Sequence, residues 1–194
     1  MSKQKLVIAS GNKGKIREIS DMLPEYEIIS YKELGFNEEI EETGSTFFEN
    51  ALIKAKTVSL ALNLPALADD SGLEVDALGG APGVYSARYA GDGDDEHNND
   101  LLLKNLENES NRKAKFVCCM VYYTPQGKYV WAQGETHGDI LFERQGKNGF
   151  GYDPLFFSKD LNKSMGVASE EEKNTVSHRA RALTQIKEKI KELN

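Results

Sequence analysis

Residues 115–124 (KFVCCMVYYT) constrain the fold more than any other part of the chain. This long apolar run, rich in β-branched and aromatic residues, predicts a buried strand. Pro125-Gln126-Gly127 predicts a turn after it, and residues 128–135 predict a second strand, so the two form a hairpin. The adjacent Cys118 and Cys119 fit two small core residues better than a disulfide or a zinc site.

Helical and extended patterns alternate before this hairpin. Helical spacing, with capping residues or breakers at the ends, predicts helices at residues 15–23, 46–62 and 94–107, from about 169, and at 177–193. Shorter apolar runs predict strands at residues 5–10, 27–30, 67–70 and 139–144. Ser71-Gly72 is expected to turn the chain after the strand at 67–70, and residues 78–93 to form a glycine-rich loop.

This order predicts a mixed α/β fold. We expect a long, twisted central mixed sheet flanked by helices on both sides, with a cleft. A length of 194 residues suits one domain spanning the whole chain, 1–194.

Charge and hydropathy narrow the class of protein. The formal net charge is −7, whereas a protein that binds double-stranded nucleic acid usually carries a basic excess. No segment reaches the roughly 18 apolar residues of a membrane span, and the apolar run 6–10 is too short for a signal peptide. We therefore expect a cytoplasmic protein that binds neither membranes nor nucleic acid.

The first candidate site is an anion-binding turn. Ser10, Gly11, Asn12, Lys13, Gly14 and Lys15 lie between a predicted strand and a predicted helix, where backbone N–H groups and two lysines can bind phosphate. The segment matches neither the P-loop nor the dinucleotide fingerprint, and it fits a solvated turn equally well. Lys54, the charged residue in the apolar middle of the second predicted helix, could contact a phosphate or extend to solvent.

The second candidate is a set of carboxylates. Glu41 and Glu42 lie in an acidic loop, and Asp69 and Asp70 follow a short apolar strand. Carboxylates at a strand end suit a hard cation such as Mg²⁺, while an ordinary acidic surface is the alternative. Because successive strand residues point to opposite faces, only one of Asp69 and Asp70 should face a given pocket.

The third candidate could recognise a base. Phe150, Gly151, Tyr152 and Asp153 combine stacking rings with a hydrogen-bond acceptor, and Lys173, His178 and Arg179 supply donors near a predicted helix start. By themselves these residues fit a turn with core aromatics and a helix cap as well. The loop containing Arg88 also fits either a phosphate contact or a rigid surface loop.

Together, the segments SGNKGK, EETGSTFFENALIKA, ADDSGLEVDALGGAPGVYSARYAG, FGYDPLFF and SHRARAL resemble the inosine triphosphate pyrophosphatase family. Bacterial members of that family are dITP/XTP pyrophosphatases. The likeness extends from Val7 to Leu183. It implies a long mixed sheet, two lobes with the active-site cleft between them, and a homodimer.

The resemblance also implies roles for single residues. Ser10, Gly11, Asn12, Lys13, Gly14 and Lys15 match the phosphate-binding turn, and Lys54 matches a lysine that reaches the triphosphate. Glu41 and Asp70 match the Mg²⁺ ligands, Asp70 also matches the proton acceptor, and Ser71 matches a substrate contact. The pocket that reads the base is matched by Phe150, Gly151, Tyr152, Asp153, Lys173, His178 and Arg179.

The implied activity is Mg²⁺-dependent hydrolysis of XTP, ITP and dITP to the nucleoside monophosphate and pyrophosphate, which removes deaminated purines from the nucleotide pool. Two other functions stay open: a pyrophosphatase for another aberrant nucleotide, and a nucleotide-binding regulator without turnover. The FGYD and SHR segments disfavour the first, and the carboxylates Glu41 and Asp70 disfavour the second. The division of metal and base roles between Asp69 and Asp70 also stays open.

Overall fold

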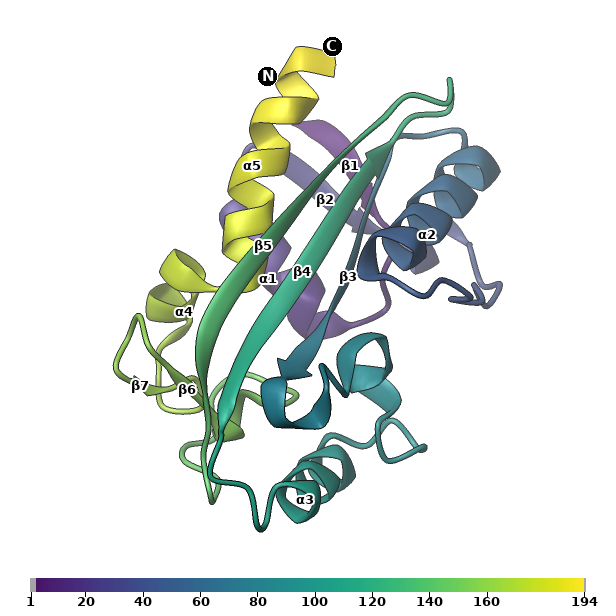
Figure 1. Cartoon of the computed structure of the whole chain (residues 1–194). Coiled ribbons are helices and arrows are strands. Elements are labelled where there is room, and N and C mark those ends of the chain that lie inside the picture. Colours follow the sequence, from purple (N-terminus) through teal and green to yellow (C-terminus); the bar gives the residue numbers. More distant parts are fainter. Residues whose placement is uncertain (1–2, 194) are drawn as a thin grey trace. The chain divides into compact units, whose positions relative to one another are not determined.

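In the computed structural model, which describes residues 3–193, seven strands form one mixed sheet in the order β2-β1-β3-β4-β5-β6-β7 (Figure 1). The strands are β1 (Gln4–Ile8), β2 (Tyr26–Ser30), β3 (Ala66–Val75), β4 (Lys113–Tyr123), β5 (Tyr129–Ile140), β6 (Phe156–Ser158) and β7 (Lys163–Ser164). β1 pairs in parallel with β2 and β3, whereas β6 pairs antiparallel with β5 and β7. The predicted mixed α/β class is confirmed.

Five α-helices lie within the described residues: α1 (Lys13–Met22), α2 (Phe47–Leu62), α3 (Asp95–Asn105), α4 (Glu170–Val176) and α5 (His178–Leu193). Four of them start at a capping side chain that accepts a backbone N–H, namely Asn12, Thr46, Asp94 and Ser169. Short 3₁₀ turns are η1 (Tyr31–Leu34), η2 (Asp76–Leu78), η3 (Gly83–Arg88) and η4 (Asp153–Leu155). The predicted loop at 78–93 therefore contains helical turns.

The chain divides into two compact units, and each has its own core. Unit 1 runs through Asp70, returns for Cys118–Gly134 and ends with the segment from Arg179 onward. Unit 2 comprises Ser71–Val117 and Glu135–His178.

In unit 1 the sheet is covered on both faces. One core contains Leu6 and Ile8 of β1 with Ile19 of α1 and Ile186 of α5. The other contains Val7 of β1 with residues of α2, including Ala51, Ala55 and Val58. Because neighbouring strand residues point to opposite faces, β1 serves both cores, and α2 and α5 lie on opposite sides of the strands (Figure 1).

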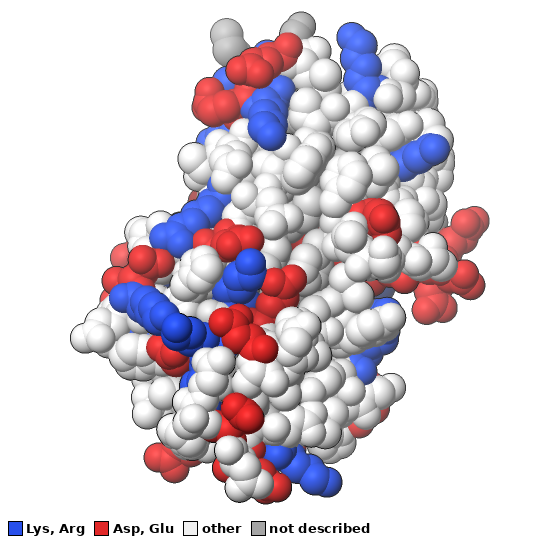
Figure 2. Space-filling model, in the orientation of Figure 1, with Lys and Arg blue, Asp and Glu red and all other residues white. Residues whose placement is uncertain are grey.

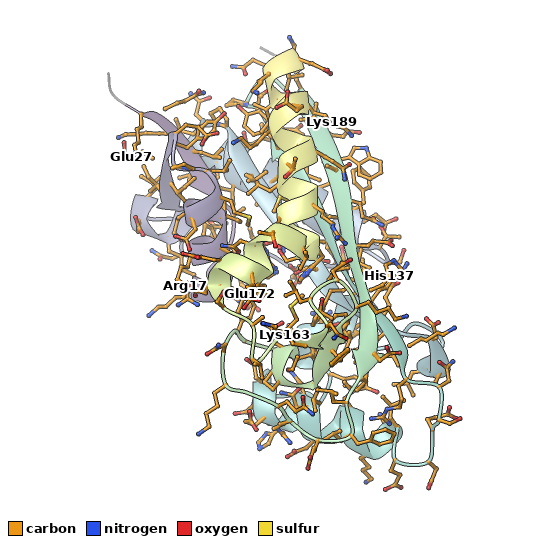
Figure 3. All side chains as sticks on the ribbon, turned by 90° about the vertical axis from the view of Figure 1, so that its left-hand side faces the viewer. Arg17, Glu27, His137, Lys163, Glu172 and Lys189 are labelled. Atoms are coloured by element: carbon orange, nitrogen blue, oxygen red, sulfur yellow. The ribbon has the colours of Figure 1, made fainter. Side chains whose placement is uncertain are left out.

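Unit 2 packs the second half of β3 against α3 and the loop before β6. Leu73 of β3, Leu102 and Leu106 at α3, and Phe116 and Phe156 form its buried cluster. α4 is held by an ion pair between Lys163 of β7 and Glu172, whose nitrogen and oxygen lie 2.8 Å apart (Figure 3). This half-exposed pair lies beside Lys173, the next residue of the helix.

Two strand predictions were wrong. β3 does not end at Asp70 but continues through Ser71 and Gly72 to Val75, because Leu73 and Val75 are buried in the core of unit 2. Propensity alone treats Asp-Asp-Ser-Gly as turn residues, and the tertiary pairing overrides it.

The second error concerns β5. Residues 129–140 form one strand in place of separate strands at 128–135 and 139–144. The strand stops at Ile140, where the Arg112 guanidinium binds the carbonyls of Ile140 and Leu141 at 2.9 and 2.7 Å. A side chain thus satisfies carbonyls that a further strand residue would otherwise need to pair.

Cys118 and Cys119 are free thiols buried in β4, as predicted. Within residues 3–193, no helix combines the length and apolar content that crossing a bilayer requires. Figure 2 shows acidic and basic side chains interspersed on the face it draws.

Candidate active site

The predicted phosphate turn is the junction of β1 and α1. Asn12 caps the helix, because its side chain accepts the Lys15 N–H at 3.2 Å while its own N–H donates to Ser10 Oγ at 3.1 Å. The helix begins at Lys13, so the turn is shorter than predicted. Its first N–H groups point outward at the positive end of the helix dipole, an arrangement that suits an anion.

Lys32 is a cation at this turn that the sequence did not indicate. A Cβ added to Gly11 would lie 2.8 Å from Lys32 Nζ, so the glycine leaves room for this ammonium group. Lys32 comes from η1, which is distant in sequence from the turn, and no motif signals the contact.

Asp69 is the centre of a buried charge network in unit 1. Its Oδ2 accepts from Arg179 Nε and Nη2 at 3.3 and 3.2 Å and forms an ion pair with Lys15 Nζ at 3.4 Å. Arg179 also pairs with Glu18. Burial alone would raise the pKa of Asp69, but the charges of Lys15 and Arg179 outweigh it and hold the pKa well below its usual range.

This network changes the expectation for Arg179. The predicted role was a contact to the base, yet its side chain is 1% exposed and is held by Asp69 and Glu18. A guanidinium with its fork occupied by two carboxylates has few donors left for a substrate. In the structure Arg179 therefore holds Asp69, and its contact to a base stays a prediction.

Asp70 points to the opposite face of β3, as the alternation of strand residues predicts. Its Oδ1 lies 3.9 Å from Lys54 Nζ, which also pairs with Glu42 at 2.7 Å and donates to the Asp69 carbonyl at 2.7 Å. Burial raises the pKa of Asp70 to about 6, because the attraction of Lys54 offsets it only in part. This carboxylate is ionised at neutral pH yet far more basic than an ordinary aspartate.

Asp70 and Glu42 fit the ligand set of a magnesium ion. Asp70 Oδ2 is buried and has no hydrogen-bond partner. Among residues 3–193, no three acidic, histidine or cysteine side chains gather as a complete metal site. Mg²⁺ commonly binds one or two carboxylates and takes its other ligands from water and phosphate, so two carboxylates suffice.

Glu41 was predicted to bind Mg²⁺ together with Asp70, and the structure pairs its neighbour Glu42 with Lys54. Glu41 is exposed. The sequence could not separate the two, because they are adjacent residues of an acidic loop. Only the position of Lys54 on α2 distinguishes them.

The predicted base-reading residues lie in unit 2, apart from Arg179. Asp153 Oδ2 accepts the Phe150 N–H at 3.1 Å and a hydrogen bond from Lys173 Nζ at 2.7 Å. Lys173 Nζ also lies 4.6 Å from the centre of the Phe150 ring. Asp153 is thus a brace inside the turn, and Phe150 is the half-buried ring that could stack on a base.

Other residues of this group have structural contacts. The Tyr152 hydroxyl donates to the Ser86 carbonyl at 2.6 Å, and its ring is buried in the unit 2 core. The His178 ring stacks on Phe116 with centroids 4.9 Å apart. Ser71 is half-buried within β3. The core-aromatic alternative for Tyr152 is therefore confirmed.

Comparison with known proteins supports the grouping of these motifs. The chain matches the Ham1 family over residues 6–189. This chain belongs to the Ham1 family. It is 49% identical to the dITP/XTP pyrophosphatase of Haemophilus influenzae, covering 97% of this chain and all of that protein. Its identity with the dITP/XTP pyrophosphatase of Staphylococcus epidermidis is 48%, over 94% of each chain.

Solved structures agree with the family. The Ham1 protein of Staphylococcus aureus superimposes with a TM-score of 0.88 at 43% identity, covering 98% of this chain and 100% of that one. A HAM1 protein from Coxiella burnetii gives the same TM-score at 40% identity, covering 97% and 99%. The sheet and helices described above are thus the Ham1 fold.

Proposed function

We propose that this Ham1-family protein hydrolyses non-standard purine nucleoside triphosphates such as ITP, dITP and XTP to the monophosphate and pyrophosphate. The supporting observation in the structure is Asp70, a basic carboxylate with an unpartnered buried oxygen beside Lys54. The full-length relatives named dITP/XTP pyrophosphatase supply the substrate class.

Residues of unit 1 bind the triphosphate in this proposal. The turn from Ser10 to Lys15 offers helix N–H groups and two lysines, and Lys54 adds a third cation. These groups stabilise the negative charge that grows on the departing pyrophosphate.

Mg²⁺ on Asp70 and one of the acids Glu41 and Glu42 would offset phosphate charge and polarise the phosphoryl group. Asp70 is the proton acceptor for the attacking water. Burial raises the pKa of Asp70, which favours proton acceptance, whereas a bound Mg²⁺ would lower that pKa again; the charges of Lys15 and Arg179 hold Asp69 ionised.

Residues of unit 2 read the base. The Phe150 ring stacks on the purine, and donors from Lys173 and His178 bind the keto oxygen at its 6-position. Adenine carries an amino group there, so it would leave donors unpaired at about 1–3 kcal/mol each. Guanine shares the keto oxygen, so its rejection depends on its 2-amino group.

The proposal includes a homodimer in the cytoplasm, where the nucleotide pool lies. The homodimer comes from the family resemblance noted for the sequence, and the cytoplasmic location is the expectation drawn from its short apolar runs.

Replacing Lys54 with alanine is expected to lower kcat/KM for ITP by about 100-fold, because one of the cations facing developing negative charge is lost. Lys56→Ala is the matched control, since Lys56 lies on the same helix and is exposed. Steady-state pyrophosphate release by the two variants measures the effect. Equal activity of Lys54→Ala and Lys56→Ala would remove Lys54 from the site.

Product identity tests the proposed reaction. Phosphorus NMR of ITP incubated with the protein should show IMP and pyrophosphate as the first products. Formation of IDP and orthophosphate would exclude the proposed bond cleavage, and an unchanged ITP spectrum would leave a nucleotide-binding regulator.

A further inference from the structure

One face of α3 holds the base-reading turn, residues 150–153, through both polar groups of Gly151. The Asp95 carboxylate accepts a hydrogen bond from the Gly151 N–H at 3.0 Å. The Asn99 side-chain amide donates to the Gly151 carbonyl at 3.1 Å. Because residues four apart lie on the same helix face, both side chains reach the turn together.

Gly151 is the point where the turn changes direction. Its φ is +59°, a left-handed conformation that glycine adopts without the steric cost of a side chain. The peptide groups on its two sides lead to Phe150 and to Tyr152, so their orientation sets the direction of the stacking ring. Fixing both groups therefore fixes the aromatic surface that would meet a purine.

α3 is firmly anchored and can act as a support. Leu102 and Leu106 are fully buried in the unit 2 core. The side chain of Asn98, also on α3, accepts the Ala90 N–H at 2.7 Å and donates to the Ala87 carbonyl at 3.1 Å. The helix thus has little freedom to follow the turn if the turn moves.

The orientation that lets Asn99 donate to the Gly151 carbonyl leaves another polar atom of Asn99 unpaired. The residue is 1% exposed, and its Oδ1 is buried without a hydrogen-bond partner. Buried polar atoms are nearly always paired, so leaving one unpaired is unfavourable. The Gly151 carbonyl needs a donor, and this need accounts for the orientation of the amide.

We propose that Asp95 and Asn99 are positioning residues for base recognition: they clamp Gly151 and so hold Phe150 at the height and angle that stacking on the purine requires. This inference rests on the proposed function. The clamp acts on the nucleoside end of the substrate, and pyrophosphate binding is independent of it.

Four variants test the clamp. Asp95→Ala and Asn99→Ala each remove one hydrogen bond to Gly151, while Asp95→Asn keeps an acceptor oxygen. Asn105→Ala is the control, because it removes a hydrogen bond of the same helix to the Tyr89 hydroxyl, 2.6 Å long. Asp95 is exposed, so its variants should fold even if Asn99→Ala does not.

Each of the two alanine variants at the clamp should raise KM for ITP by about fivefold, the effect of one hydrogen bond, while the inhibition constant of pyrophosphate changes less than about twofold. Asp95→Asn and Asn105→Ala should behave as wild type. Unchanged KM in Asp95→Ala, or a parallel rise of KM and of the pyrophosphate constant, would overturn the clamp.

Calorimetric binding of IMP separates this inference from the proposed function. If the wild-type protein binds IMP without hydrolysing ITP, weaker IMP binding by Asp95→Ala supports the clamp and unchanged binding overturns it. If the wild type hydrolyses ITP and all variants match it, only the clamp is wrong. If the wild-type protein neither binds IMP nor hydrolyses ITP, both the proposed function and the clamp are wrong.

Discussion

Replacing Asp70 with asparagine is expected to lower kcat for ITP by about a thousandfold while the protein stays folded. The amide has the same shape, but it can neither accept the proton of the attacking water nor supply an anionic ligand to Mg²⁺. Pyrophosphate release under saturating ITP measures the loss. Asp76→Asn, at an exposed position of unit 2, is the control and should keep full activity.

The same variant should be more stable than the wild type above pH 6 in metal-free buffer. Burial raises the pKa of Asp70 to about 6, so the folded protein holds this proton more tightly than the unfolded chain does. Stability therefore falls as pH rises from about 4 to about 6, by roughly 2 kcal/mol, and the neutral amide escapes that loss.

Melting temperatures at about pH 4.5 and about pH 7.5, which lie on either side of the titration of Asp70, test the direction of this pH dependence. The difference between Asp70→Asn and wild type should grow with pH. A variant that keeps wild-type kcat would contradict the role of Asp70, and one that is less stable at the higher pH would contradict its buried environment.

Asp69→Asn should have the opposite effect on stability. It removes the charge that compensates Arg179 inside unit 1, and breaking a buried ion pair from one side typically costs about 3–5 kcal/mol. Arg179 keeps Glu18 as a partner, so we expect about 3 kcal/mol. Urea unfolding measures the loss, and Asp21→Asn, exposed on α1, should change stability by less than about 0.5 kcal/mol.

The pH dependence of Asp69 follows from its lowered pKa. A depressed pKa in the folded state stabilises the protein above the unfolded pKa of about 4, and this contribution disappears as pH falls through the folded value. The gap between wild type and Asp69→Asn should therefore narrow on acidification. A gap that is absent at neutral pH would mean that Asp69 and Arg179 are not paired.

Much of the fold could be predicted because local signals and tertiary packing agree. The β4–β5 hairpin, the capped starts at Thr46 and Ser169, and the breaker Pro24 all behave as their residue types predict. The errors arose where packing overrides propensity. Ser71 and Gly72 remain in a strand because both of its ends are buried, and β5 stops where Arg112 binds its carbonyls.

For the candidate site, the sequence indicated which residues to consider better than it indicated which side chains they contact. The motifs singled out Lys15, Lys54 and Asp70, because a charge beside a short apolar strand or in the apolar middle of a helix is conspicuous in a sequence. They could not show that Arg179 turns inward to Asp69 or that Glu42, the neighbour of Glu41, pairs with Lys54. Contacts such as these depend on long-range geometry that spacing does not encode.

The most direct test of the central claim is pyrophosphate release from ITP, XTP, GTP and ATP, each with and without Mg²⁺. We predict Mg²⁺-dependent release from ITP and XTP, with GTP and ATP slower by about tenfold or more, equivalent to about 1.4 kcal/mol. Equal rates on all four nucleotides would contradict the proposed recognition of the purine base. No release from any of them would contradict the proposed enzymatic activity.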